Sequence, residues 1–205
     1  MGNTDFLGKI LVGKLLNEMR IISGKLKGKS IKYVKSLITR PLKDSVKENI
    51  FNILAHNSLF KIDINNANVL DLYSGVGSFG IECISRGANK ITFVEKDKTA
   101  INLLRENLIT LSVQKKADIF EGDISQFFKK SIDNKFEIFF FDPPFKNNDY
   151  LDYISLISNK KIFKDNHVVI IHRERKTSEI IDKFLKPILI KEYSRSKIIF
   201  GKLFA

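Results

Sequence analysis

The sequence predicts an α/β fold, in which a doubly wound, mostly parallel sheet of seven strands carries an antiparallel C-terminal hairpin and a small basic N-terminal extension of a β-hairpin and a helix. Three observations predict this class. From Asn68 onward, short apolar runs alternate with helical patterns, as in parallel sheets. A glycine-rich turn follows the first apolar run. The last two runs are joined only by Ser194, Arg195 and Ser196, a link that suits an antiparallel hairpin and is too short for a parallel crossover.

Length, cysteine content and charge limit the function classes. A chain of 205 residues with 43% hydrophobic residues can form one domain with a well-buried core. The single cysteine, Cys83, excludes an internal disulfide, and no histidine and cysteine residues have zinc-site spacing, so we expect a cytoplasmic protein without a metal. No segment has the length and apolarity of a membrane span. The net charge of +12 indicates a polyanionic partner or an anionic surface.

The first part of the chain predicts the basic extension. Residues 1–18 are expected to be an N-terminal extension, either one amphipathic helix or sequence upstream of a true start at Met19. Residues 19–57 predict an appendage made of a hairpin over 19–34 and a helix over 43–56. Nine Lys or Arg and one acid lie between positions 20 and 47, a net charge of +8. Lys25, Lys27, Lys29 and Lys32 would line one exposed side of the hairpin and pair with phosphates.

Residues 58–205 predict the main domain. Strands are expected at 68–73, 90–95, 117–121, 136–142, 167–172, 188–193 and 197–204. Helices are expected at 78–87, 97–111, 124–131 and 178–186. The run that ends at Phe141 is almost wholly apolar, which favours a central strand. His167 and His172 are expected to pack or to meet solvent, and neither is given a role.

The turn after the first strand predicts a cofactor site. Gly75 and Gly77 allow a tight turn and leave no side chain between the backbone and a ligand, and Gly80 would let the next helix pack closely. Glu95 ends the next strand, twenty residues past Gly75, where a carboxylate can bind a ribose. Asp71 lies inside the first strand, and its carboxylate would face the open end of the sheet. That position favours the ammonium group of S-adenosylmethionine (SAM) over a pyrophosphate, without excluding NAD, and the alternative is an ordinary strand-to-helix turn.

Asp142-Pro143-Pro144-Phe145 follows the predicted central strand and carries the more specific chemistry. Two prolines fix the backbone and remove two N–H donors, which leaves a rigid run of carbonyl acceptors. With a carboxylate beside it, such a surface can accept both hydrogens of an exocyclic amine on a nucleobase and direct the nitrogen lone pair at an electrophile. Phe145 offers a face on which the base can stack. The alternative is a strand exit stiffened by proline.

Together these motifs resemble the amino-group branch of the class I SAM-dependent methyltransferases. A narrower resemblance, over about residues 19–204, is to the RsmD type of 16S ribosomal RNA guanine-N2 methyltransferase. It is carried by Met19 to Gly24, Arg40-Pro41, Asp44 to Asn52, the segment from Gly75 to Ala88, and Asp142 to Phe145. One departure is Leu42, because the family usually has threonine there and this helix therefore loses a capping hydroxyl.

The resemblance implies methyl transfer from SAM to the N2 amine of a guanine in 16S ribosomal RNA, the small subunit or an assembly intermediate, by a Rossmann-like monomer. Asp142, Pro143, Pro144 and Phe145 would be catalytic. The residues implied at the cofactor are Asp71, Tyr73, Ser74, Gly75, Gly77, Glu95, Lys96, Asp123 and Ile124. Those implied at the RNA are Arg20, Lys25, Lys27, Lys29 and Arg40.

Asp123 has an alternative reading as a plain helix cap. Two other functions also stay open. One is methylation of another RNA, a DNA adenine or a protein glutamine amide, and the other is a nucleotide-binding module without catalysis.

Overall fold

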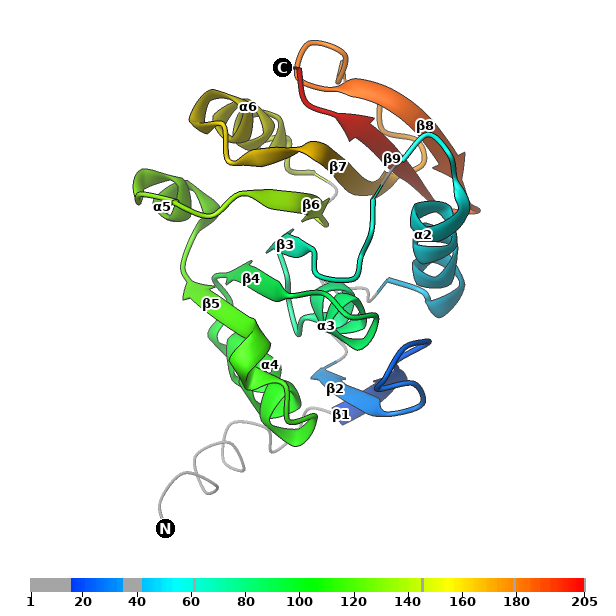
Figure 1. Cartoon of the computed structure of the whole chain (residues 1–205), viewed down its shortest axis with the longest axis vertical. Coiled ribbons are helices and arrows are strands. Elements are labelled where there is room, and N and C mark those ends of the chain that lie inside the picture. Colours follow the sequence, from blue (N-terminus) through cyan, green and yellow to red (C-terminus); the bar gives the residue numbers. More distant parts are fainter. Residues whose placement is uncertain (1–15, 35–41, 61, 145, 179, 205) are drawn as a thin grey trace.

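The computed structural model describes residues 16–34, 42–60, 62–144, 146–178 and 180–204. Its main sheet has seven strands in the order β5-β4-β3-β6-β7-β9-β8 (Figure 1). Their bounds are β3 Asn68–Leu72, β4 Lys90–Glu95, β5 Ala117–Glu121, β6 Phe136–Phe141, β7 Phe163–Glu174, β8 Lys186–Glu192 and β9 Ser196–Lys202. Strands β3 to β7 pair in parallel, whereas β9 is antiparallel to both β7 and β8. The strand order reverses between β3 and β6, so the predicted doubly wound fold is confirmed.

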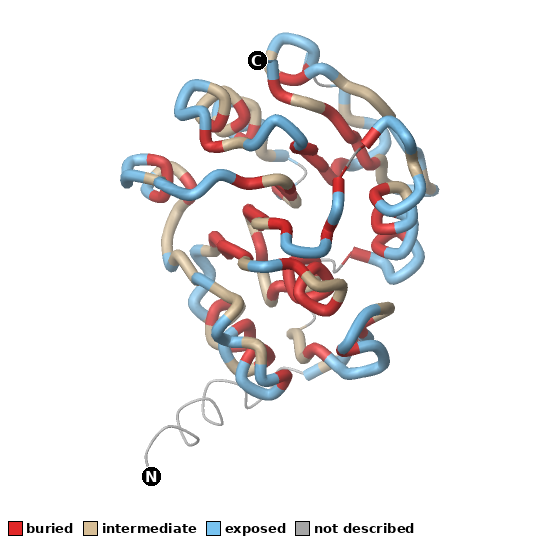
Figure 2. The backbone as a smooth tube through the Cα atoms, viewed as in Figure 1, coloured by how far each residue is buried: buried red, intermediate tan, exposed pale blue. Residues whose placement is uncertain are grey.

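Helices cover both faces of this sheet and give it two cores. The first face carries α2 (Asp44–His56), α3 (Ser78–Ser85) and α4 (Lys98–Thr110), and the other carries α5 (Ile124–Lys129) and α6 (Tyr150–Lys160). Side chains alternate along each strand. In β6, Phe140 therefore joins the first core and Phe139 the second. Figure 2 shows buried residues along the central strands, as expected for a sheet covered on both sides.

The basic hairpin, β1 (Leu16–Arg20) paired with β2 (Ser30–Val34), is docked on helix α3. The Glu82 carboxylate accepts hydrogen bonds from the backbone N–H groups of Ile22 (2.9 Å) and Ser23 (3.0 Å). The Ser85 carbonyl accepts one from Lys25 N–H at 2.7 Å. Gly24 is required beside it, because its φ is +81° and a Cβ there would overlap the Ser85 carbonyl. Apolar hairpin residues join the α2–α3–α4 core, namely Met19, Ile21, Leu26 and Ile31.

The predictions for the C-terminal third differ from the structure in three places. The described residues of 178–186 form only a turn, in which the N–H of Leu185 donates to the Ile181 carbonyl, and β8 already begins at Lys186. Pro187 disfavours a helical conformation for the residue before it, which limits this segment to one turn. Helix α6 was not predicted, although its buried residues Tyr150, Ile154 and Ile157 have helical spacing. Strand β7 also begins earlier than predicted, at Phe163.

Candidate active site

The glycine-rich turn and the Asp-Pro-Pro corner (residues 142–144) leave adjacent strands at the same edge of the sheet. Strands β3 and β6 pair in register, with Leu72 opposite Phe141. The next residue, Asp142, donates its N–H to the Leu72 carbonyl at 3.4 Å. This is the carboxyl edge, at the point where the strand order reverses and where such sheets bind ligands. The structure therefore brings the two predicted motifs together.

The turn between β3 and α3 contains three residues in the left-handed region: Tyr73 (φ +60°), Gly75 (φ +55°) and Gly77 (φ +82°). A bulky residue such as Tyr73 is strained in this conformation, and such strain is concentrated at functional sites. The two glycines serve different purposes. A Cβ on Gly75 would meet nothing within 4 Å, whereas a Cβ on Gly77 would overlap the Leu104 side chain. Only Gly75 borders open space that a ligand can fill.

Gly80 and Asp71 fix the start of helix α3. A Cβ on Gly80 would overlap the ring of Phe93 in β4, which confirms the predicted close helix packing. Asp71 is only 1% exposed, and its Oδ2 accepts a hydrogen bond from Gly80 N–H at 3.0 Å. Burial raises the pKa of the Asp71 carboxyl well above its usual range. The expectation that this carboxylate faces the open end of the sheet is wrong, because it points at the first turn of α3.

Glu95, at the end of β4, ties the glycine-rich turn to the neighbouring strand. Its Oε2 accepts a hydrogen bond from Gly75 N–H, and its Oε1 accepts from the N–H groups of Lys96 and Asp97, each at 2.8 Å. The side chain stays partly exposed at the carboxyl edge. Glu95 therefore shapes the turn whatever else it binds. Ser74 also links the turn to β4, since its N–H donates to the Val94 carbonyl at 3.2 Å.

Asp123 is a helix cap, as the alternative reading stated. Its Oδ1 accepts a hydrogen bond from Ser125 N–H at 2.9 Å, and Gln126 completes a capping box at the start of α5. The backbone hydrogen bond from Ser125 lowers the pKa of the Asp123 carboxyl. Its Oδ2 lies 3.6 Å from Lys96 Nζ, so two predicted cofactor residues meet at the edge of the sheet. Ile124 is buried in the second core.

The corner is contacted by β7, whose residues were not predicted to take part. His172 Nδ1 lies 2.8 Å from Asp142 Oδ1, and the Arg173 guanidinium donates to the Pro144 carbonyl at 3.3 Å. The signal for the first contact is strand register, because Phe141 pairs with Ile171 and the next residues are therefore neighbours. Phe145 and Arg40, both predicted site residues, lie outside the described residues.

Of the predicted RNA-binding residues on the hairpin, the three lysines lie away from this edge. Arg20 lies nearer to it, because Lys47 Nζ donates both to the Arg20 carbonyl (3.2 Å) and to Oγ of Ser78, the first residue of α3 (3.3 Å). Lys25, Lys27, Lys29 and Arg20 are exposed, as expected. The turn that carries the three lysines is anchored at Ser85, the last residue of α3, about 10 Å along the helix from its start beside the glycine-rich turn. Lys32 does not join the exposed row, because it forms an ion pair with Glu106 of α4 at 2.5 Å.

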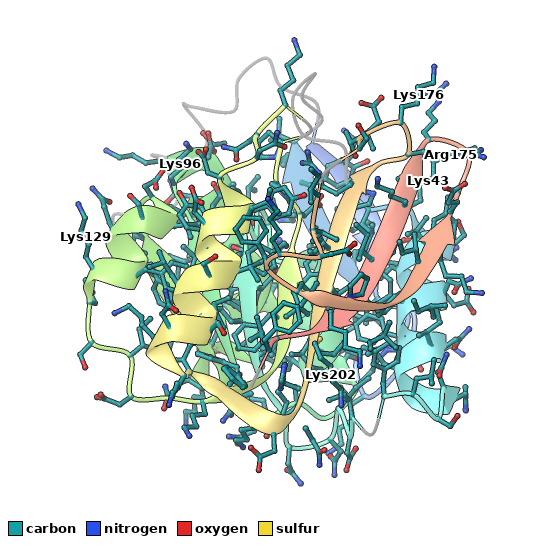
Figure 3. The ribbon with its side chains drawn as sticks, turned by 90° about the horizontal axis from the view of Figure 1, so that it is seen from above. Lys43, Lys96, Lys129, Arg175, Lys176 and Lys202 are labelled. Carbon is teal, nitrogen blue, oxygen red and sulfur yellow. The ribbon has the colours of Figure 1, made fainter. Side chains whose placement is uncertain are left out.

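A second group of basic residues lies at the carboxyl edge itself. Figure 3 shows Lys96 along one side of the molecule with Lys43, Arg175 and Lys176, opposite Lys202. Lys96 follows the last residue of β4, and Arg175 follows the last residue of β7. These side chains therefore flank the corner.

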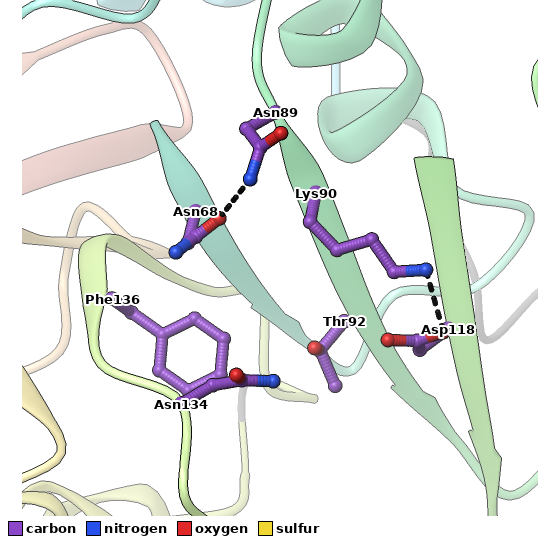
Figure 4. Close-up of a pocket in the computed structure, with 7 residues that line it drawn as sticks. All are labelled: Asn68, Asn89, Lys90, Thr92, Asp118, Asn134 and Phe136. Atoms are coloured by element: carbon purple, nitrogen blue, oxygen red, sulfur yellow. Dashed lines mark hydrogen bonds and ion pairs between the residues drawn. The ribbon is translucent and has the colours of Figure 1, made fainter. Parts of the chain in front are cut away.

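A pocket is present at the opposite edge, among the amino-terminal ends of β3, β4, β5 and β6 (Figure 4). Its lining residues are Asn68, Asn89, Lys90, Thr92, Asp118, Asn134 and Phe136. It lies apart from the two motifs. Among the residues that the structure describes, no three acidic, histidine or cysteine side chains are grouped to hold a metal ion. No helix in this part of the chain is long and apolar enough to cross a membrane.

Comparisons with known proteins agree with this geometry. Residues 19–202 match the family described as conserved hypothetical protein 95. The chain is 34% identical over 169 residues to the ribosomal RNA small subunit methyltransferase D of Haemophilus influenzae, covering 82% of this chain and 84% of that protein.

Two solved structures are similar. One from Escherichia coli, yhhF, is described provisionally as a methyltransferase; it is 25% identical with a TM-score of 0.76 and covers 92% of this chain and 99% of that one. A more distant structure, described as complexed with SAH, is 15% identical with a TM-score of 0.65. It covers 86% of this chain and 54% of its own, and its likeness concerns the fold alone.

Proposed function

Because the chain belongs to the conserved hypothetical protein 95 family, that of the RsmD-type class I methyltransferases, we propose that it transfers a methyl group from SAM to the exocyclic N2 of a guanine in 16S ribosomal RNA. The observation that carries the proposal is the contact between the two motifs. Asp142, the first residue of the corner, donates its N–H to the carbonyl of Leu72, the last residue of the strand that leads into the glycine-rich turn. We further propose that it acts as a cytoplasmic monomer on the RNA, the small subunit or an assembly intermediate.

Two observations at the glycine-rich turn support a SAM site there. Gly75 borders open space, and the Tyr73 hydroxyl is buried without a hydrogen-bond partner among the described residues. The ligand would be held by Gly75, Glu95, Lys96 and Asp123. Asp71 and Gly77 would fix the shape of the turn from its buried side. When bound, SAM supplies a methyl group on a sulfonium whose C–S bond breaks as the bond from N2 to the methyl carbon forms.

The protein's part is to orient and deprotonate the amine. Asp142 and the Pro143 carbonyl would each accept one hydrogen of the guanine amine, which leaves the nitrogen lone pair directed at the methyl carbon. Alignment of this kind can supply on the order of 7–11 kcal/mol. Asp142 would then accept the surplus proton from N2 and release it to water. The target base must be unstacked, which favours an unpaired nucleotide.

The same proposal divides the chain by role. Residues 19–57 would bind RNA and residues 58–205 would carry out methyl transfer. Leu16–Glu18, which were predicted to lie in the N-terminal extension, pair with β2 as part of strand β1 and so belong to the hairpin.

The test is mass mapping of 16S ribosomal RNA from cells with and without this protein. We expect one guanine to lose its N2-methyl group in the deletion strain and to regain it when the purified protein, SAM and the unmethylated RNA are combined. Unchanged modification in the deletion strain, or restoration by the Asp142→Ala variant, would contradict the proposal. The latter outcome would favour a nucleotide-binding module without catalysis at this corner.

A further inference from the structure

Two consecutive residues of β7 hold the Asp-Pro-Pro corner from opposite faces of the sheet. His172 contacts the Asp142 carboxylate through Nδ1 at 2.8 Å. Arg173 points to the other face, as alternation along a strand requires. Its guanidinium donates to the Pro144 carbonyl at 3.3 Å and to Asn148 Oδ1 at 3.1 Å, and it lies over the Tyr150 ring. Each end of the corner is thus fixed by a side chain of the next strand.

The burial of these two residues makes their contacts restrictive. Arg173 is 1% exposed and His172 is 8% exposed. A buried guanidinium is stable only when it is hydrogen bonded, so Arg173, the Pro144 carbonyl and the Asn148 side chain hold each other in place. A neutral His172 can donate its Nδ1–H to an ionised Asp142, which fixes the rotamer of the carboxylate.

These contacts divide the acceptors of the corner into used and unused ones. Asp142 Oδ1 and the Pro144 carbonyl are bonded to β7. Among the described residues, no donor bonds Asp142 Oδ2 or the Pro143 carbonyl. Two acceptors therefore stay available, which is the number that a primary amine with two hydrogens needs.

We propose that His172 and Arg173 are positioning residues that select which two acceptors meet the substrate amine: Asp142 Oδ2 and the Pro143 carbonyl. The inference rests on the proposed function. His172 acts through Asp142, and Arg173 acts through the loop backbone.

Three variants of His172 test this role. His172→Ala removes the contact, His172→Asn places an amide N–H where Nδ1 now lies, and His172→Gln places one farther from the backbone. We expect His172→Ala to slow single-turnover methylation of 16S ribosomal RNA by roughly 10- to 100-fold, because a small misplacement of a reacting group has effects of this size. SAM affinity, measured by calorimetry, should change by less than about twofold. Asn should restore most of the rate and Gln should not.

A double variant separates positioning from general structural damage. If His172 acts only through Asp142, Asp142→Asn combined with His172→Ala should be as slow as Asp142→Asn alone. Additive losses, or equal rates for the Asn and Gln variants, would overturn the assignment.

Arg173 is tested indirectly, because its removal from a buried site can unfold the chain. Asn148 is exposed, so Asn148→Ala should fold normally while it loses one Arg173 contact. We expect it to slow methyl transfer by a few-fold without changing SAM affinity, and an unchanged rate would overturn the role of Arg173.

The activity of the wild-type protein distinguishes a failure of the proposed function from a failure of the positioning role. If it transfers no methyl group to 16S ribosomal RNA, the proposed function fails. If it is active and His172→Ala is equally fast, only the positioning role fails.

Discussion

Two carboxylates, Glu82 and Asp142, show how a group that holds the fold together differs from one that is available to a ligand. Glu82, in α3, is fully buried and accepts hydrogen bonds from Ile22 N–H, Ser23 N–H and Arg86 Nε–H, with Lys47 Nζ 3.9 Å away. The Asp142 side chain is 29% exposed, and only its Oδ1 has a partner among the described residues. A carboxylate whose acceptors are all used holds the fold together. One with an unused oxygen beside open space is available to a ligand.

The largest expected effect is a loss of stability when Glu82, which anchors the hairpin to α3, is removed. Glu82→Ala removes the acceptor of the hairpin backbone and leaves two cations, Lys47 and Arg86, without their shared buried partner. Breaking a buried ion pair in this way costs about 3–5 kcal/mol. We expect urea unfolding to show a loss of this size. Asp142→Ala is the matched control and should lower the free energy of unfolding by less than about 1 kcal/mol. Equal losses would mean that both carboxylates are structural.

The next effect is on turnover, at the corner. Asp142→Ala should reduce the methylation rate at saturating SAM by on the order of 100-fold, because the amine loses one of its two acceptors and its proton acceptor. SAM affinity should change far less, since the carboxylate is proposed to contact the amine. Single-turnover kinetics and calorimetry measure the two quantities. A rate and an affinity that fall together would place Asp142 at the cofactor.

A third comparison sets the two glycines of the turn against each other. Asparagine tolerates the left-handed conformation that both positions need. Gly77→Asn should lower the free energy of unfolding by about 1–3 kcal/mol, because its side chain overlaps Leu104. Gly75→Asn should leave stability within about 0.5 kcal/mol but weaken SAM binding, because its side chain enters the open space. Undiminished affinity in Gly75→Asn would place the cofactor elsewhere.

Local patterns in the sequence are enough to predict most of the fold. The alternation of strands and helices, the glycine-rich turn and the proline corner each lie within a dozen residues, and all are found where expected. The contact between His172 and Asp142 joins residues thirty apart and depends on the register of β6 and β7, which no local pattern specifies. The segment before β8 was wrongly predicted as a helix because its local pattern is helical. Ile180, Ile181, Phe184 and Leu185 have helical spacing, but pairing with β9 takes over at Lys186.

The pH dependence of stability tests the environment of Asp71. Its pKa is raised in the folded chain, so the folded state holds this proton more tightly than the unfolded state does. Stability should therefore fall as the pH rises from the ordinary aspartate pKa toward the raised value. Asp71→Asn keeps an acceptor for Gly80 N–H and removes the titration. The variant should lose less stability than the wild type between about pH 4 and pH 8. Parallel curves would mean that the carboxyl is not buried in solution.

The smallest effect concerns the two basic regions. The lysines at 25, 27 and 29 are exposed but sit at the far end of α3 from the cofactor turn, whereas Lys43 and Lys176 lie at the carboxyl edge. If the RNA spans both regions, changing the three hairpin lysines to glutamine should weaken RNA binding. The slope of the logarithm of the binding constant against the logarithm of the salt concentration should become shallower by up to about 2. Turnover at saturating RNA should not change, because these residues do not reach the reacting amine. Lys202→Gln, on the opposite side, is the control. The same change to glutamine can be made at Lys43 and Lys176. If only those variants reduced the salt slope, the RNA would be confined to the carboxyl edge. The hairpin would then have a structural role only.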